Sequence, residues 1–410
     1  MQPSHDLYLL PRLMGTISAM GMPKRVTVIA RRVRLTILIM EKQRRPKWEM
    51  AVCFMKLMER IIAWPREYRW SIGASLKYWR DSGMWACGGA KLASMTNAEL
   101  VRAAWKAGTV IPGFNIPYLP MMEPVVRALR DTRCAGFIMV ARLEWVKFES
   151  GSLAAVRKEY ERVKDERFTG LHLDHVPVID EDDQRVDFLP IMREAADLGY
   201  GSMMVDGSRL PLNENIAATR AVAELGRRAG AAVEGELGMV MGHGEGPLPP
   251  YEELFKSGKG FTDPEEARRF VAETGADWLS VAVGSLHGAI SKAKKHEKKA
   301  EARLDIPHLK RINATARVPL VLHGGTGIRK EYIMDGIRNG IAKVNIATAI
   351  RQPYEAAAGN KVAGPPASLA ARVDAAKAAV YEATVRVIRE DLEVAGTADR
   401  LGKAKEKPNG

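Results

Sequence analysis

Three histidines stand at or just past the ends of short apolar runs in this 410-residue chain, namely His175, His287 and His323. If these runs are neighbouring strands of one parallel sheet, the three imidazoles meet at a single edge. Three neutral imidazoles with a fourth position left open describe a catalytic zinc site. Any one of them alone could be a hydrogen-bonded structural histidine. Three at one edge favour a metal ion.

A carboxylate adjoins the first of these histidines, since Asp174 immediately precedes His175. Successive side chains of a strand point to opposite faces, so we expect Asp174 not to bind the metal as His175 does. At a strand end it could instead reach the substrate and move a proton to or from a hydroxyl group. The structural alternative is that Asp174 only caps the helix that follows.

Two later segments, 324–327 and 345–348, combine small residues with hydroxyl and amide groups. Glycines let backbone N–H groups approach an anion closely, and Thr326 and Thr348 add hydroxyl donors. Gly288, directly after His287, extends the same set. These segments predict a phosphate-binding site.

Eight short β-branched or apolar runs precede the polar residues and alternate with helical patterns, which is typical of βα units. The runs are Val110 to Phe114, Phe137 to Ala141, Gly170 to Asp174, Ser202 to Asp206, Ala232 to Glu236, Trp278 to Gly284, Pro319 to His323 and Ala342 to Ile346. The helical patterns include Met121 to Arg130, Leu189 to Leu198, Asn213 to Ala229, Pro264 to Thr274 and Lys330 to Asn339. Eight such units in about 250 residues predict an α/β protein with a (β/α)8 TIM barrel, whose chemistry sits at the carboxyl ends of the strands.

The net charge of +13 is concentrated in residues 1–94, which hold 17 Lys and Arg against 6 Asp and Glu. The remaining residues are nearly neutral, so we expect no nucleic-acid partner for the barrel. We interpret 1–94 as a basic N-terminal extension without an independent fold. A basic arm that binds nucleic acid or membrane is the alternative. A third possibility is that Met95 is the true start, because a capped amphipathic helix begins there.

The cysteines and the hydropathy pattern suggest a soluble protein in a reducing compartment. Cys53, Cys87 and Cys134 show no CxxC spacing, so neither a disulfide framework nor a thiolate metal site is expected. No run of about 18 uninterrupted apolar residues appears, so we expect no membrane partner. The cytoplasm is the expected location.

The ordered motifs between Thr96 and Leu392 resemble those of the class II fructose-bisphosphate and tagatose-bisphosphate aldolases. They are Pro112 to Asn115, His172 to His175, Val205 to Ser208, Glu234 to Gly238, Thr262 to Ala267, Val283 to Gly288, His323 to Gly327 and Lys343 to Thr348.

This resemblance implies a lyase of carbohydrate metabolism, such as glycolysis, that reversibly cleaves a ketose phosphate to dihydroxyacetone phosphate and an aldehyde through a metal-stabilised enediolate. It implies that Asp174 is the catalytic acid/base and that Glu236 is an alternative metal contact beside the three histidines. It also implies a homodimer or homotetramer. The triose phosphate and a monovalent cation, Na+ or K+, would be held by residues of the glycine-rich loop and its neighbours, namely Asn115, Gly288, Gly324, Gly325, Thr326, Asn345 and Thr348.

Two segments depart from the family pattern. The flexible loop that supplies a glutamate to proton transfer reads Gly242-His243-Gly244-Glu245-Gly246 here, so Glu245 is the expected catalytic residue and His243 the alternative. Small polar residues are usual after the second strand, where this chain has Ala141 to Trp145. The sugar pocket is therefore expected to differ in shape, and the sugar itself is left open.

The sequence thus predicts a basic extension at 1–94, an aldolase barrel at 95–392 and a polar tail at 393–410. Two functions from other classes stay open. One is a zinc hydrolase on the same barrel, and the other is a phosphosugar-binding homologue without turnover.

Overall fold

The computed structural model describes residues 95–239, 251–285, 302–359 and 369–404. Eight parallel strands form a closed barrel in chain order, with β1 paired to β8. The expected (β/α)8 barrel is confirmed. The strands are β1 Ile111–Asn115, β2 Gly136–Ala141, β3 Thr169–Pro177, β4 Ser202–Asp206, β5 Ala232–Leu237, β6 Trp278–Val281, β7 Leu320–Leu322 and β8 Ile341–Ile346.

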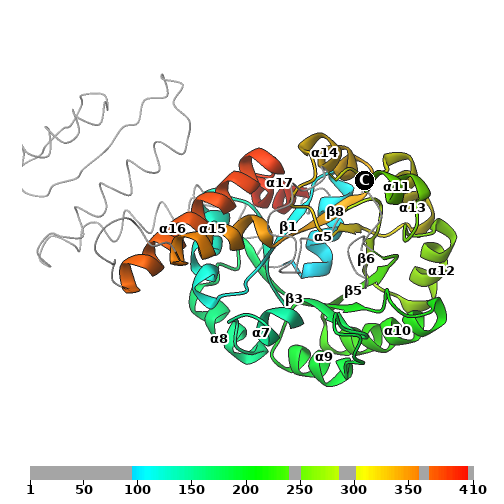
Figure 1. Cartoon of the computed structure of the whole chain (residues 1–410), viewed down its shortest axis with the longest axis horizontal. Helices are drawn as coiled ribbons and strands as arrows, with labels where there is room; N and C mark the ends of the chain where they lie inside the picture. The colour runs from blue at the N-terminus through cyan, green and yellow to red at the C-terminus, as the bar shows by residue number, and fades with distance from the viewer. Residues whose placement is uncertain (1–94, 240–250, 286–301, 360–368, 405–410) are drawn as a thin grey trace, which may run out of the picture. The chain divides into compact units, whose positions relative to one another are not determined.

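Helices surround the barrel, as Figure 1 shows. Between the strands lie α6 Met122–Asp131, α7 Arg142–Val146, α8 Leu153–Val163, α9 Phe188–Asp197, α10 Leu212–Ala229, α11 Tyr251–Ser257, α12 Pro264–Thr274, α13 Ile306–Ala316 and α14 Lys330–Arg338, with a short 3-10 turn, η2 Leu119–Met121. After the last strand come α15 Thr348–Gly359, α16 Leu369–Arg386, the π-helical turn η4 Val387–Asp391 and α17 Thr397–Ala404.

Helix α12 illustrates how local sequence sets these boundaries. The Asp263 carboxylate accepts hydrogen bonds from the backbone N–H groups of Glu265 and Glu266, both at 2.9 Å, and Pro264 stands at the first helical position. Gly275 ends the helix at φ +70°, a left-handed conformation that favours glycine.

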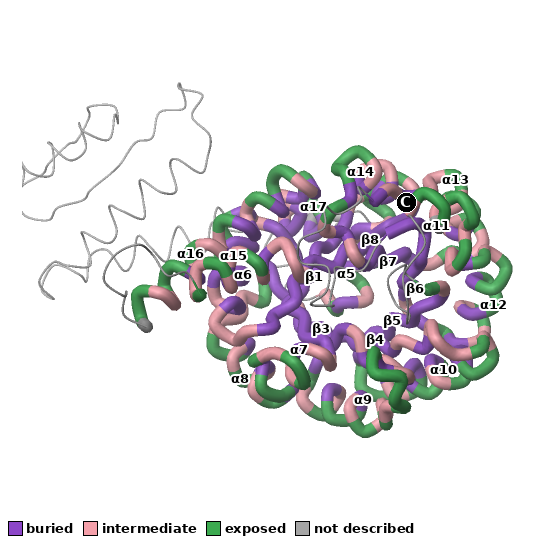
Figure 2. Tube along the Cα trace, in the orientation of Figure 1, coloured by how far each residue is buried: buried purple, intermediate pink, exposed green. Residues whose placement is uncertain are grey.

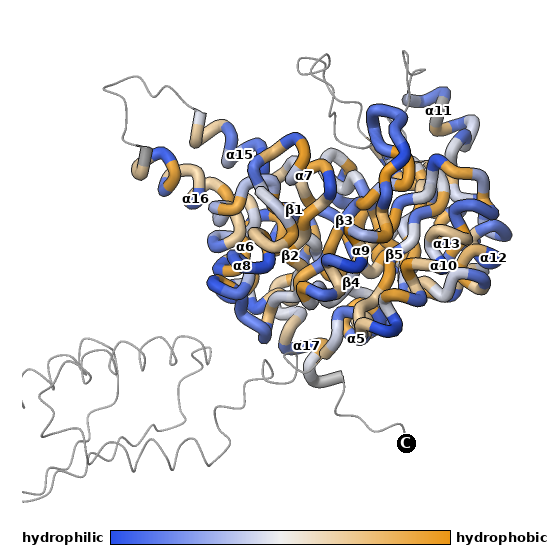
Figure 3. The backbone as a smooth tube through the Cα atoms, turned by 90° about the horizontal axis from the view of Figure 1, so that it is seen from below, coloured by the Kyte–Doolittle hydropathy of each residue, from blue (hydrophilic) through white to orange (hydrophobic). Residues whose placement is uncertain are grey.

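The core is made by strands buried on both faces. Every residue of β1, β2, β5 and β8 is buried, as expected for parallel strands covered by helices. Figure 2 shows the buried strands inside a ring of helices whose outer surfaces are exposed, and Figure 3 shows the apolar residues gathered along the strands. Polar side chains inside the barrel therefore need partners.

One end of the barrel is covered by α5 Asn97–Lys106. Its first turn is fixed by a capping box, in which Thr96 and Glu99 exchange hydrogen bonds. The Asn97 amide donates to the carbonyl of Leu171 at 3.1 Å and to Oγ of Ser202 at 2.8 Å, which ties the helix to β3 and β4. In Figure 3, α5 and α17 lie at one end of the barrel, while α7, α11 and α15 lie toward the other.

The segment expected to be a polar tail from residue 393 is partly folded. Its described residues include α17, in which Ala398 and Leu401 are buried. Oγ1 of Thr397 accepts a hydrogen bond from the backbone N–H of Ala135 at 3.1 Å. The chain is thus packed into the fold at least as far as Leu401.

Within the described ranges, the helices are too short or too polar to span a bilayer.

Candidate active site

Strand β3 supplies three of the site's side chains, His172, Asp174 and His175. His172 and Asp174 share one face of the strand, and Nε2 of His172 lies 3.8 Å from Oδ1 of Asp174. The pairing of β3 with β4 shifts register between Leu173 and Val176. Such a bulge re-aims a side chain, so His175 also reaches the site, although it follows Asp174 directly.

His175 meets His323, which follows β7, across the mouth of the barrel. Nε2 of His175 lies 2.6 Å from Nδ1 of His323. The outer nitrogen of each ring faces a carboxylate. Nδ1 of His175 lies 3.5 Å from Oδ2 of Asp206, and Nε2 of His323 lies 2.8 Å from Oε1 of Glu234.

These outer contacts determine what the inner nitrogens can do. A carboxylate accepts hydrogen bonds, so each outer nitrogen carries the proton and each inner nitrogen presents a lone pair. Two lone pairs facing each other at 2.6 Å repel unless a cation or a proton is shared between them. The pair of His175 and His323 therefore fits a metal ion.

Glu236 completes a three-residue group with these histidines, whose ligand atoms all lie within 4.8 Å of one another. Its Oε2 lies 3.8 Å from Nδ1 of His323 and accepts a hydrogen bond from Oγ of Ser280 at 3.3 Å. Burial and the charge of Asp206 raise the pKa of Glu236 well above its usual range. A cation at this position would stabilise the ionised form of the Glu236 carboxylate.

The electrostatic field at His175 favours positive charge. Burial lowers the pKa of His175, but the hydrogen bond with Asp206 and the charges of Glu236 and Asp174 outweigh this effect and raise it to about 10. For His323 the balance is reversed, since burial and the nearby His175 lower its pKa. One positive charge, carried by a proton or by a metal ion, therefore suits the pair.

A second possible metal-binding group, formed by Asp174, Glu234 and His323, is less suited to a cation. Nζ of Lys343 lies 2.8 Å from Oε2 of Glu234, and Trp278 Nε1 donates to the same oxygen at 2.5 Å. The lysine charge outweighs burial and, with the His323 hydrogen bond, lowers the pKa of Glu234. The negative charge of Glu234 is therefore already balanced by the positive charge of Lys343, which disfavours a metal ion at this carboxylate.

Asp174 is held by two amides from the first and last strands. Nδ2 of Asn115 donates to its Oδ2, and Nδ2 of Asn345 donates to its Oδ1, both at 2.9 Å. Burial raises the pKa of Asp174, but the contact with His172 and the charges of His175 and Lys343 outweigh it and lower the pKa well below the usual range. Asp174 is therefore an ionised, oriented carboxylate that can accept a proton.

The loop after β7 is shaped by glycines, with Gly324 at φ +69° and Gly327 at φ +98°. Oγ1 of Thr326 is buried and has no hydrogen-bond partner among the described residues. A cavity of about 570 Å³ lies beside Gly325 and Thr326, on the side of α15 and η4, and of the described site histidines neither His175 nor His323 lines it. Thr348 stands at the first position of α15, where N–H groups can bind an anion.

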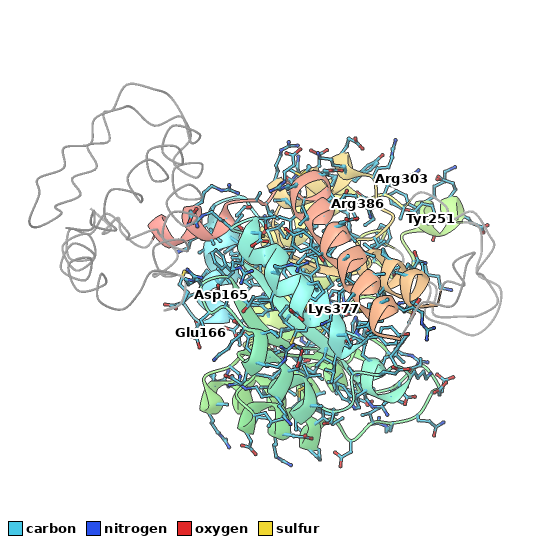
Figure 4. The ribbon with its side chains drawn as sticks, turned by 90° about the vertical axis from the view of Figure 1, so that its left-hand side faces the viewer. Asp165, Glu166, Tyr251, Arg303, Lys377 and Arg386 are labelled. Atoms are coloured by element: carbon cyan, nitrogen blue, oxygen red, sulfur yellow. The ribbon has the colours of Figure 1, made fainter. Side chains whose placement is uncertain are left out.

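Four residues expected to act at the site lie outside the described residues. They are His243, Glu245, His287 and Gly288. The described chain between them is anchored by Tyr251, whose hydroxyl donates to the carbonyl of Gly284 at 3.0 Å and accepts from the backbone N–H of Arg303 at 2.7 Å. Figure 4 shows Tyr251 and Arg303 close together at α11.

Sequence reasoning assigned no role to Asp206, Glu234 or Lys343. A signal was present, because Glu234 and Glu236 alternate along β5, as Lys343 and Asn345 do along β8, so each pair shares a face. What the strand pattern could not show is which residue on one strand meets which on another.

Glu144 was also missed, although the segment from Ala141 to Trp145 was noted as unusual. Its Oε2 accepts a hydrogen bond from the backbone N–H of Ala141 at 2.8 Å, and the side chain is buried. Burial, together with the negative charge of Asp174, outweighs the opposing hydrogen bonds and raises the pKa of Glu144 to about 8. A further carboxyl group of shifted pKa thus lies near Asp174.

Comparison with known proteins gives a consistent result. The family described as fructose-bisphosphate aldolase class-II matches residues 95–400. The chain is similar to the YdjI aldolase of Escherichia coli K12, with 26% identity and a TM-score of 0.58, over 73% of this chain and 98% of that one. It is also similar to a candidate fructose-1,6-biphosphate aldolase from Coccidioides immitis, with 27% identity and a TM-score of 0.58, over 73% and 97% of the two chains. A fructose-bisphosphate aldolase from Campylobacter jejuni, 19% identical, shares the fold with a TM-score of 0.54 over 72% and 93%.

Proposed function

Because the chain belongs to the class II fructose-bisphosphate aldolase family, we propose that it is a zinc-dependent aldehyde-lyase that cleaves a ketose phosphate to dihydroxyacetone phosphate and an aldehyde. The observation that carries the zinc assignment is the short contact between the inner nitrogens of His175 and His323, each backed by a carboxylate. Histidines oriented in this way are typical of zinc sites.

In this proposal His175 and His323 hold the metal with His287, which lies outside the described residues, and Glu236 is an alternative contact. When bound, zinc supplies Lewis-acid stabilisation of the negative charge that develops on the substrate oxygens. The carboxylates of Asp206 and Glu234 orient the two imidazoles and keep their outer nitrogens protonated.

Asp174 is the proposed acid/base at the bond that breaks. Its carboxylate is ionised and held on both oxygens, so it can take the proton of the substrate hydroxyl as the aldehyde forms, and return it in the reverse direction. The electron pair of the broken bond stays with the triose-phosphate half. The carbon of this half at which the bond broke then takes a proton from a loop residue. Glu245 is the expected donor, and His243 is the alternative.

The phosphate is proposed to bind where the loop after β7 meets the start of α15. Thr326 offers a buried hydroxyl with no partner among the described residues, and Thr348 begins a twelve-residue helix whose N-terminus favours an anion. Gly324, Gly325 and Gly288 are proposed to bring backbone N–H groups to the same anion, and a monovalent cation, Na+ or K+, is proposed beside it.

A panel of ketose monophosphates and bisphosphates, with coupled detection of triose phosphate, tests the proposal. Cleavage that is lost on chelation and restored by zinc supports it. Phosphosugar binding without cleavage of any member would identify a homologue without turnover. Chelator-insensitive cleavage would contradict the zinc assignment.

A further inference from the structure

A single buried ammonium group connects the histidine pair to the acid/base. Lys343 lies on β8 and is fully buried. Its Nζ donates to Oε2 of Glu234 at 2.8 Å and to Oδ1 of Asn345 at 2.7 Å. Glu234 connects Lys343 to His323, and Asn345 connects it to Asp174, while the Asn345 amide nitrogen also lies 3.1 Å from Nε2 of His323.

The first arm runs from Lys343 through Glu234 to His323. The other oxygen of Glu234 accepts the hydrogen bond from Nε2 of His323 at 2.8 Å. The hydrogen bond at one ring nitrogen fixes the tautomer and the orientation of the ring. Lys343 holds the carboxylate ionised and in place, and so helps to turn Nδ1 of His323 toward His175.

The second arm runs from Lys343 through Asn345 to Asp174. An asparagine amide has an acceptor end and a donor end. Because Lys343 binds the oxygen, the amide nitrogen is turned toward Oδ1 of Asp174, to which it donates at 2.9 Å. Without the ammonium, the amide oxygen of Asn345 loses this donor, so the side chain that contacts Asp174 is no longer held at both ends.

We propose that Lys343 is a positioning residue that orients the metal-binding His323 and the acid/base Asp174 together. This inference rests on the proposed function of the same site. A buried ion pair is weak support for stability as such, because desolvation offsets much of the attraction between the charges. Lys343 instead bonds both to Glu234, which orients His323, and to Asn345, which contacts Asp174, and this double contact gives it a role in the site.

Lys343→Met in the full chain tests the proposal, with zinc affinity measured by competition against a chelator. Loss of a residue behind a metal ligand typically weakens metal affinity by about 10-fold to 100-fold, and we expect a loss in that range. We also expect the ratio of substrate cleavage to hydrogen exchange at dihydroxyacetone phosphate to fall, because Asp174 acts only in cleavage.

Trp278→Phe is the matched control. The indole donates to the same oxygen of Glu234, and within the described part of the chain no hydrogen bond joins it to Asn345. This variant should weaken zinc binding less than Lys343→Met and leave the ratio of cleavage to exchange at its wild-type value.

A folded Lys343→Met protein with wild-type zinc affinity, or with a wild-type ratio of cleavage to exchange, would overturn the proposal. If that variant does not fold, Lys343→Met combined with Glu234→Gln removes both buried charges, and weakened zinc binding is again expected. Wild-type affinity in the double variant also refutes the role. A wild-type chain that binds no zinc would instead overturn the proposed function.

Discussion

Nε2 of His175 and Nδ1 of His323 lie 2.6 Å apart, although the two residues are 148 positions apart in the chain. Each ring is turned inward by a carboxylate on its outer side, Asp206 for one and Glu234 for the other. The inner nitrogens of the two rings meet at one point, where a proton or a metal ion can be shared between them. This contact is the feature from which the metal predictions follow.

Each of the single substitutions His175→Ala, His287→Ala and His323→Ala should remove most of the bound zinc, because the three proposed ligands bind one ion and none is spare. Elemental analysis of the purified proteins measures this. His308→Ala is the matched control, since His308 lies on α13 and bonds to the carbonyl of Thr262, and it should keep the metal. Retention of one zinc per chain in all three ligand variants would contradict the assignment.

Asp174→Ala should keep zinc and phosphosugar binding while turnover falls about 100-fold to 10,000-fold, the usual contribution of general acid/base catalysis. Hydrogen exchange at dihydroxyacetone phosphate should persist, because the transfer of that carbon-bound proton is assigned to the loop residue and not to Asp174. Deuterium incorporation separates the two steps. If exchange and cleavage are both lost while zinc and ligand still bind, Asp174 organises the whole site and its assigned role is wrong.

Glu144 should make stability depend on pH. Its pKa is about 8 in the folded protein against an ordinary value of 4.5, so between these values the folded state binds more protons than the unfolded state. The contribution of Glu144 to stability is therefore fully present below about pH 4.5 and is lost as the pH rises to about 8. Urea unfolding at pH 6 and pH 9 should show a smaller decrease for Glu144→Gln than for the wild type. Equal decreases in both proteins would show that this carboxyl is not the source.

A protein that begins at Met95 should be soluble and bind zinc, because the charge excess of residues 1–94 stops where the barrel pattern begins. A protein that begins at Ala107 is the control. It lacks α5 and the Asn97 contacts to β3 and β4, so it should aggregate. Insolubility or loss of zinc binding in the first protein would mean that residues 1–94 belong to the fold.

The barrel could be predicted because each strand carries its own local signal. Ser202–Asp206 and the helix Pro264–Thr274 have the expected bounds, and the other predicted strands differ by a few residues at their ends. Strand ends are set by pairing with neighbours, which a single run does not reveal.

The site was predictable in part for the same reason. Residues at strand ends, such as Asp174 and His323, could be named from their position alone. The register shift in β3 and the contact of Lys343 with Glu234 could not, because each depends on how one strand meets another and not on the sequence of one strand. Glu144 could not be predicted either, because its raised pKa comes mainly from burial, which the sequence around it does not reveal.

The pairing of β1 with β8 also has a consequence for synthesis on the ribosome. Asp174 takes one hydrogen bond from Asn115 on the first strand and one from Asn345 on the last. A nascent chain that has not yet emerged past Ile346 lacks the strand that closes the barrel and half of the support of this carboxylate. The proposed acid/base therefore gains both of its amide hydrogen bonds only when the final strand joins the first, so no shorter N-terminal fragment carries the complete arrangement.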